Sequence, residues 1–221
     1  MPTLIKESAV SHNMKPARLL VPLCGTICLM LFGCGAFRPN GSGPATLERK
    51  VPRYARVALV EFFDRSRYPG TAEQFTGALR EQLSNITAST DFVVIGRSAL
   101  PGFEDPFTGG KLPVASLAQA RRDYHADAVI IGAIEDHNPY YKPSVAVSIK
   151  LIDTAQGAVI CEFSETRNAN TRRVSDDIGI YYRENFGRDD CRFGPDVFLI
   201  SPRYFLKYAA RRAAERVADR M

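Results

Sequence analysis

Few residues of this sequence have the types and spacing that acid–base or nucleophilic chemistry needs. Asp136 and His137 are adjacent, and a carboxylate beside an imidazole can move protons. A triad could be drawn from His137, Asp64 and Ser66, but no Gly-x-Ser-x-Gly motif surrounds the serine. The other interpretation is that Asp136 and His137 belong to a polar loop between two strands. We favour this second interpretation and predict that the chain is not an enzyme.

Metal and cofactor chemistry find no better support in the sequence. Histidines and cysteines do not occur in pairs at the spacing of a metal site. The glycines form neither a phosphate-binding loop nor a dinucleotide fingerprint. We therefore predict no metal and no cofactor.

The cysteine with the clearest chemical context is Cys34. It ends an apolar segment over residues 19–33 that follows the basic residues Lys15 and Arg18. A basic start, a dozen or so apolar residues and a small residue before the break are typical of a secretory signal. The segment is short for a transmembrane helix, which needs about 20 apolar residues.

Residues 31–34, Leu-Phe-Gly-Cys, resemble a bacterial lipobox. In that family of signals the cysteine is lipidated and the chain is cut just before it, after a small residue such as Gly33. Phe32 departs from the usual small or branched residue. The resemblance implies a lipoprotein attached to membrane lipid through Cys34; an ordinary cleaved signal and an uncleaved anchor are the alternatives. All three place the remaining chain outside the cytoplasm.

Besides the lipidated Cys34, the mature chain would keep two cysteines, Cys161 and Cys191. In an oxidising compartment such a pair is a candidate disulfide. The alternative is a buried Cys161 on a strand and an unrelated Cys191 in a loop, and the spacing does not decide between them.

The composition indicates a globular protein. Its hydrophobic and charged fractions, 45% and 24%, are ordinary, and the formal net charge is +5. No basic cluster alternates with exposed aromatic residues, so nucleic acid is not a predicted partner. We predict three regions: a lipoprotein signal peptide at 1–33, a lipidated Gly- and Pro-rich tether at 34–54, and a single α/β periplasmic domain at 55–221.

The pattern of apolar residues predicts a mixed α/β sheet of about five strands with flanking helices and a C-terminal helix. Thr71 and Gln74 predict a capping box at the first helix. Charged residues crowd residues 165–196, which we interpret as a long excursion with one or two helical turns near 174–184. The predicted strands lie at 56–63, 92–95, 126–134, 145–152 and 158–164, and the predicted helices at 72–88, 114–124 and 202–220.

Three sequence segments, in their order along the chain, resemble segments of a known group of envelope proteins. They are residues 56–62 (Arg-Val-Ala-Leu-Val-Glu-Phe), 126–132 (Ala-Asp-Ala-Val-Ile-Ile-Gly) and 151–159 (Leu-Ile-Asp-Thr-Ala-Gln-Gly-Ala-Val). Together they resemble the periplasmic domain of CsgG-like lipoproteins, the curli-secretion channel family, and of the TolB N-terminal domain, a structural group that includes LpoB-like activators. The resemblance implies envelope lipoproteins that work through protein–protein contacts, and it carries no catalytic residue.

Two tyrosine pairs are candidate partner contacts. Tyr140 and Tyr141 lie between prolines that limit backbone freedom, and Tyr181 and Tyr182 lie in the excursion. Tyrosine is enriched where protein interfaces gain most of their binding energy. The alternative for both pairs is packing within the fold.

The sequence therefore predicts a non-enzymatic assembly or accessory factor that contacts unidentified envelope proteins. The alternative is an oligomeric outer-membrane secretion-channel subunit of the curli-transport type, and homo-oligomerisation is left open. Gly35 after Cys34 is not the Asp associated with inner-membrane retention in enteric bacteria, which favours the outer membrane.

Overall fold

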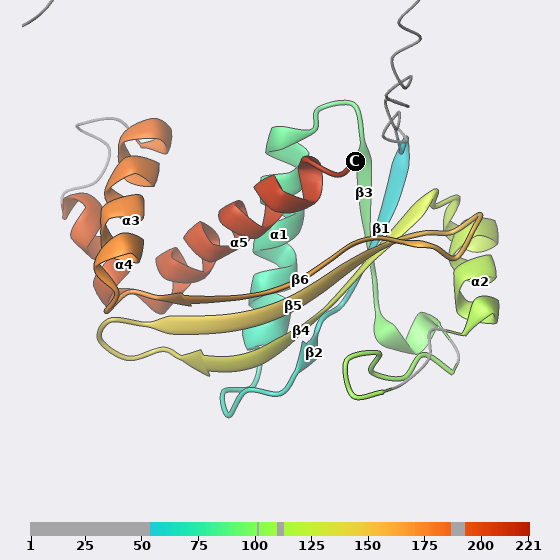
Figure 1. The fold of residues 1–221 in the computed structure, drawn as a ribbon, viewed down its shortest axis with the longest axis horizontal. Helices are drawn as coiled ribbons and strands as arrows, with labels where there is room; N and C mark the ends of the chain where they lie inside the picture. The colour runs from blue at the N-terminus through green and yellow to red at the C-terminus, as the bar shows by residue number, and fades with distance from the viewer. Residues whose placement is uncertain (1–53, 101, 110–112, 187–192) are drawn as a thin grey trace, which may run out of the picture. The chain divides into compact units, whose positions relative to one another are not determined.

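The computed structural model describes residues 54–100, 102–109, 113–186 and 193–221 (Figure 1). The predicted signal, Cys34, Cys191 and the tether up to residue 53 lie outside the described residues. The elements are β1 Arg56–Val60, β2 Phe63–Asp64, α1 Thr71–Ile86, β3 Asp91–Ile95, the 3₁₀ turn η1 Arg97–Ala99, α2 Val114–Tyr124, β4 Ala128–Asn138, β5 Ser144–Asp153, β6 Val159–Asn168, α3 Arg172–Asn185, the 3₁₀ turn η2 Gly194–Asp196, α4 Val197–Ile200 and α5 Pro202–Ala218.

The strands form one six-stranded mixed sheet. Five strands run in the order β3-β1-β4-β5-β6, and the two-residue β2 also pairs with β4. β1 is parallel to β3 and β4, whereas β4, β5 and β6 form an antiparallel meander. The predicted mixed sheet with flanking helices and a C-terminal helix is confirmed.

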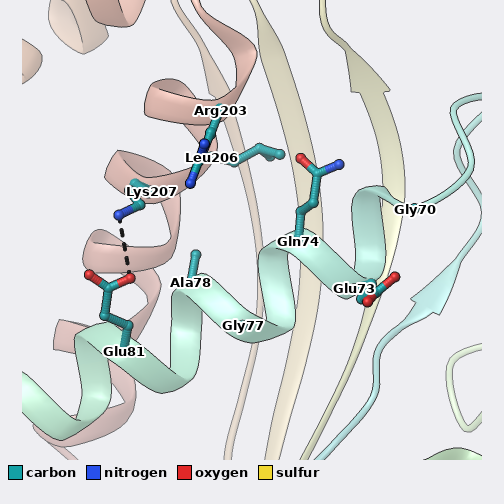
Figure 2. A pocket seen from close by; sticks show the side chains of 9 residues that line it. All are labelled: Gly70, Glu73, Gln74, Gly77, Ala78, Glu81, Arg203, Leu206 and Lys207. Atoms are coloured by element: carbon teal, nitrogen blue, oxygen red, sulfur yellow. Dashed lines mark ion pairs between the residues drawn. The ribbon is translucent and has the colours of Figure 1, made fainter.

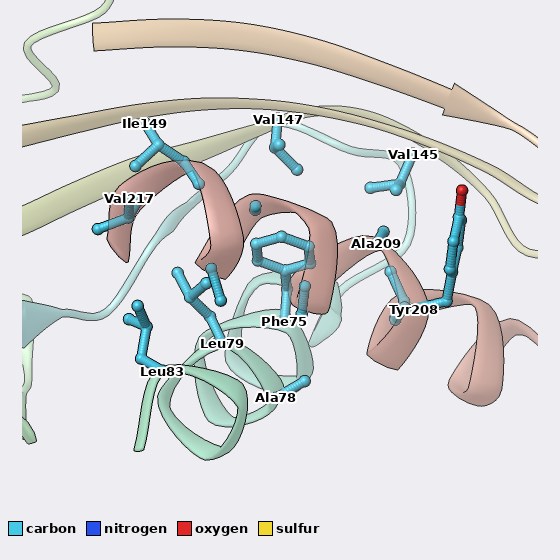
Figure 3. Close-up of a cluster of buried hydrophobic side chains, with 14 of the residues drawn as sticks. Phe75, Ala78, Leu79, Leu83, Val145, Val147, Ile149, Tyr208, Ala209 and Val217 are labelled. Atoms are coloured by element: carbon cyan, nitrogen blue, oxygen red, sulfur yellow. The ribbon is translucent and has the colours of Figure 1, made fainter. Parts of the chain in front are cut away.

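The main core lies between one face of the sheet and helices α1 and α5. Alternate residues of β5 point into it because successive side chains of a strand face opposite sides. Figure 3 shows three of them, Val145, Val147 and Ile149, in one cluster with Phe75 of α1 and Val217 of α5. All five side chains are buried, so this face is the main source of hydrophobic stabilisation.

A smaller core lies on the opposite face, under α2 and the segment after β3. Ala58, Val60, Val129, Ile131 and Ile152 supply the sheet side of it. β4 therefore contributes to both cores, and its first seven residues are all buried. A strand covered on both faces reads as a continuous apolar run, which is why the sequence predicted this strand without alternation.

β6 is longer than the sequence predicted. It continues to Asn168, four residues into the predicted excursion. Two charged residues of this extension, Glu165 and Arg167, form an ion pair with each other. Glu165 also pairs with Arg216 of α5, and Arg167 also pairs with Asp177 of α3. Ion pairing thus lets charged residues continue the strand, and the predicted helical turns become the 14-residue helix α3.

Between β1 and β2, the chain brings Phe62 against the backbone of β4. A Cβ placed on Gly132 would lie 2.2 Å from a carbon of the Phe62 ring. Phe62 is fully buried, its ring packs against Phe75 at 5.6 Å, and its N–H donates to Thr76 Oγ1 at 3.1 Å. Gly132 is therefore required for close approach, as glycine in a strand often is.

Gly132→Ala should destabilise the fold by about 1–3 kcal/mol or more, because the added methyl group overlaps the Phe62 ring. Chemical denaturation of the full chain measures the change. Gly179→Ala in α3 is the matched control: its Cβ would meet only the end of Arg183 at 3.7 Å, so it should be neutral or stabilising by about 0.5–1 kcal/mol. Equal stability of Gly132→Ala and wild type would contradict the close approach.

Candidate interaction surface

The tyrosine loop, residues 139–143, joins β4 to β5. Its two aromatic side chains, Tyr140 and Tyr141, are 66% and 72% exposed. The backbone beside them is held: the Lys142 N–H donates to Leu199 O at 2.9 Å, and the Ala169 N–H donates to Pro143 O at 2.9 Å. The loop therefore presents exposed rings on a backbone tied to two other segments.

Tyr68 supports the loop from the segment before α1. Its ring meets Tyr140 edge-on, with the ring centroids 5.8 Å apart, and meets His137 in the same way at 6.0 Å. This contact was not predicted, because Tyr68 and Tyr140 are far apart along the chain.

His137 lies inside β4 rather than in the predicted polar loop. Its side chain is buried, and its Nδ1 lies 3.0 Å from Ser144 O. Because a carbonyl can only accept, Nδ1 must carry the proton of this hydrogen bond. Burial lowers the pKa of His137, although the hydrogen bond to Ser144 opposes the shift. His137 thus fastens the end of the β4–β5 hairpin in its neutral form.

Asp64 and Ser66 organise the turn into α1. Ser66 Oγ lies 2.6 Å from Asp64 Oδ1, and Asp64 Oδ2 accepts the N–H of Ala72 at 3.3 Å. The predicted capping box at Thr71 is wrong: Gly70, in the left-handed conformation, precedes the helix, and the Thr71 hydroxyl donates to Tyr68 O at 2.8 Å. The carboxylate of Asp64 therefore takes the place of a cap.

The structure does not assemble the triad drawn from the sequence. Among the described residues, no hydrogen bond joins Ser66 to His137. Asp136 lies exposed on β4, paired across the strands with Ala146. Within the same residues, no group of three or more His, Cys, Asp and Glu side chains is arranged to hold a metal ion.

A groove of about 600 Å³ lies between α1 and α5. Figure 2 shows Arg203 and Lys207 of α5 facing α1, with an ion pair of 3.4 Å between Lys207 and Glu81. Gly77 leaves the groove open, since a Cβ there would meet nothing within 4 Å. The lining residues are Gly70, Glu73, Gln74, Gly77, Ala78, Glu81, Arg203, Leu206 and Lys207.

The α1–α5 groove and the tyrosine loop are neighbours through residues 68–70. Gly70 lines the groove, and Tyr68, two residues earlier, packs on Tyr140. Beyond Arg203 of the groove, Tyr204 is partly exposed and its ring packs on Phe198. The groove was not predicted, because it arises where two helices distant in sequence pack side by side.

The second tyrosine pair is buried. Tyr181 and Tyr182 are 3% and 6% exposed, and Tyr181 packs edge-on against Phe198 and Tyr208. The apolar face of α3 turns both rings into the core, so a partner would not reach them in this fold. The alternative of packing within the fold applies to this pair.

The cysteine predictions stay predictions. Cys161 lies on β6 and is half-buried, and Cys191 and Cys34 lie outside the described residues. Among the helices that the structure describes, none is long and apolar enough to cross a membrane.

The described fold is a mixed α/β domain with helices on both faces of the sheet. No protein-family model and no curated protein matches this sequence.

Solved structures with a similar arrangement include PelC from Paraburkholderia phytofirmans, a dodecamer (19% identity, 56% of this chain and 80% of that chain, TM-score 0.39). Two others are the lipoprotein GNA1162 from Neisseria meningitidis (12%, 59% and 96%, 0.38) and the C-terminal domain of LpoB from Escherichia coli (15%, 54% and 87%, 0.35).

The burial of His137 leads to a prediction about how the stability of the protein depends on pH. Because the folded protein holds the neutral imidazole, the pKa of His137 is lower in the folded than in the unfolded state, where it is about 6.5. Its contribution to stability should be complete above about pH 6.5 and should be lost as the pH falls toward the folded pKa. Urea unfolding measured on both sides of this window tests it.

His137→Gln should make the free energy of unfolding less dependent on pH in this window. His125→Asn is the control: His125 ends α2 in the left-handed conformation, which asparagine tolerates. A slope that changes with His137→Gln and not with His125→Asn would assign the pH dependence to position 137. A His137→Gln curve parallel to the wild-type curve would contradict the assignment.

Proposed function

We propose that this protein is a membrane-anchored periplasmic lipoprotein that acts without catalysis, as an assembly or accessory factor, by binding a partner protein through the tyrosine loop and the α1–α5 groove. The observation that carries the proposal is the pair of exposed tyrosines on a loop whose backbone is already held in place. A rigid aromatic loop loses little conformational freedom on binding, so more of the contact energy becomes affinity.

The surface also has the mixed character of a protein-binding site. The groove offers an apolar floor at Ala78 and Leu206 between acidic residues of α1 and basic residues of α5. Interfaces commonly combine such an apolar centre with a charged rim and aromatic anchors. The residues that suggested catalysis have structural duties instead, Asp64 and Ser66 at the start of α1 and His137 at the β4–β5 pairing.

The compartment in this proposal rests on the sequence. The segment before Cys34 supports secretion and lipidation, and Gly35 supports the outer membrane. An anchored domain would then meet its partner at the periplasmic face of that membrane.

Cys34→Ala should abolish incorporation of a labelled fatty acid into the protein made in a bacterial host, because the thiol is the acceptor of the lipid. Cys28→Ala, inside the predicted signal, is the matched control and should keep the label. Autoradiography of the immunoprecipitated protein measures both. Equal labelling of Cys34→Ala and wild type would remove the lipoprotein proposal.

A photo-crosslinking amino acid in place of Tyr141 should join the full chain to a discrete envelope protein in cells. The same amino acid in place of Val114, which is 81% exposed on α2, is the control and should not. In a separate variant without the photo-crosslinking amino acid, Tyr140→Ser should weaken binding of the identified partner about tenfold or more, as expected for an aromatic hot spot. Its free energy of unfolding should fall by no more than about 0.5–1.5 kcal/mol, the value of the lost ring contact with Tyr68, since the side chain is otherwise exposed.

Two results would count against this surface as the binding site. One is an identical crosslinking pattern at positions 141 and 114. The other is full partner affinity after replacement of both loop tyrosines by serine.

A further inference from the structure

A second cavity, away from the tyrosine loop residues, lies where β6, α3 and α5 meet. It has a volume of about 670 Å³, within the usual size range of small-molecule sites. We call it the arginine pocket. It is lined by Arg167, Arg172, Arg173, Asp176, Asp177, Ile180 and Arg212.

The deep wall of the arginine pocket is a fixed ion network around Asp177. This carboxylate accepts the Tyr208 hydroxyl at 2.5 Å and two N–H groups of Arg212 at 2.8 and 3.0 Å. Arg167 approaches it at 3.7 Å. Burial alone would lower the pKa of Arg212, but hydrogen bonds to Glu215 and Asp177 raise it above its ordinary value. Arg212 is therefore held in place as a cation, and Arg167 lies beside it on the same carboxylate.

The outer wall carries two arginines that the fold does not need. Arg172 and Arg173 are exposed and occupy the first two positions of α3, which has no acidic residue in its first turn. Cations at this end of a helix are unfavourable, because the helix dipole is positive there. Arg172 reaches Asp176 only at 3.8 Å with both groups largely exposed, and no described ion pair involves Arg173.

The charges of the pocket do not cancel. The inner arginines also pair with two glutamates outside the lining, Arg167 with Glu165 and Arg212 with Glu215, and these glutamates pair in turn with Arg216 and Arg211. The whole network therefore has six arginines against four carboxylates, an excess of two positive charges. A phosphate monoester carries about −1.5 to −2 charges at neutral pH, and its oxygens accept paired N–H groups from guanidinium. Ile180, 43% exposed, gives the pocket an apolar wall beside the charged one.

We propose that the arginine pocket binds a phosphate monoester, with Arg167 and Arg212 as the fixed inner donors and Arg172 and Arg173 closing on the anion from α3. The pocket is larger than a phosphate group, so the group that carries the phosphate would lie along Ile180. The ester could be a soluble molecule or the headgroup of an anionic lipid. This inference does not depend on the proposed partner binding.

The test measures thermal unfolding of the full chain in neutral detergent micelles. Glycerol 3-phosphate is titrated against sodium chloride at the same ionic strength. In a second arm, the full chain is placed in phosphatidylcholine nanodiscs with and without phosphatidic acid. A ligand that binds only the folded state raises the melting temperature with its concentration. A rise with glycerol 3-phosphate indicates a soluble ester, and a rise only with phosphatidic acid indicates a lipid headgroup.

The informative variant is Arg172→Gln/Arg173→Gln. Without ligand it should melt at or above the wild-type temperature, because it removes two cations from the positive end of α3. With ligand it should need about tenfold or more of the phosphate for the same rise, since charge-assisted hydrogen bonds are lost. Arg183→Gln, an exposed arginine of α3 outside the pocket, is the control and should respond like wild type.

Two outcomes would overturn the proposal. The first is no rise in melting temperature in either arm with the wild-type chain. The second is an equal rise for wild type and Arg172→Gln/Arg173→Gln, which would mean that the phosphate acts elsewhere.

Discussion

The packing of Phe62 on Gly132 is the constraint on which the rest of the domain depends. β1 and β2 both pair with β4 but are separated by two residues, and Phe62 fills the space between them. Only a residue without a Cβ at position 132 lets the ring lie against the strand. The same ring meets Phe75, so one contact aligns the sheet with α1.

The candidate surface follows from this alignment. β2 pairs with β4 at Ala133 and Ile134, directly after Gly132, and this pairing places Asp64 where it can accept the N–H of Ala72. The start of α1 in turn sets the position of Tyr68. A buried contact thus positions an exposed loop through a short series of hydrogen bonds and ring contacts.

The sequence predicted what depends on near neighbours. The helix at 114–124 has the predicted bounds. What it missed depends on distant residues: the continuation of β6 needs Arg216 and Asp177, and the groove needs α1 beside α5. Tyr181 and Tyr182 were ambiguous because an aromatic pair reads alike on a surface and on the buried face of a helix.

The sequence segments that carry the family resemblance have structural roles in this fold. Asp127 accepts the backbone N–H groups of Ala55 and Arg56, and Thr154 donates to the carbonyl of Ala126, so both hold the start of β4. Such residues indicate which fold the chain adopts and do not indicate its function. A function is indicated instead by groups that the fold does not need: the exposed tyrosine rings on a loop with a fixed backbone, and the two arginines at the positive end of α3. Residues that lower the stability of a protein are retained where they serve binding.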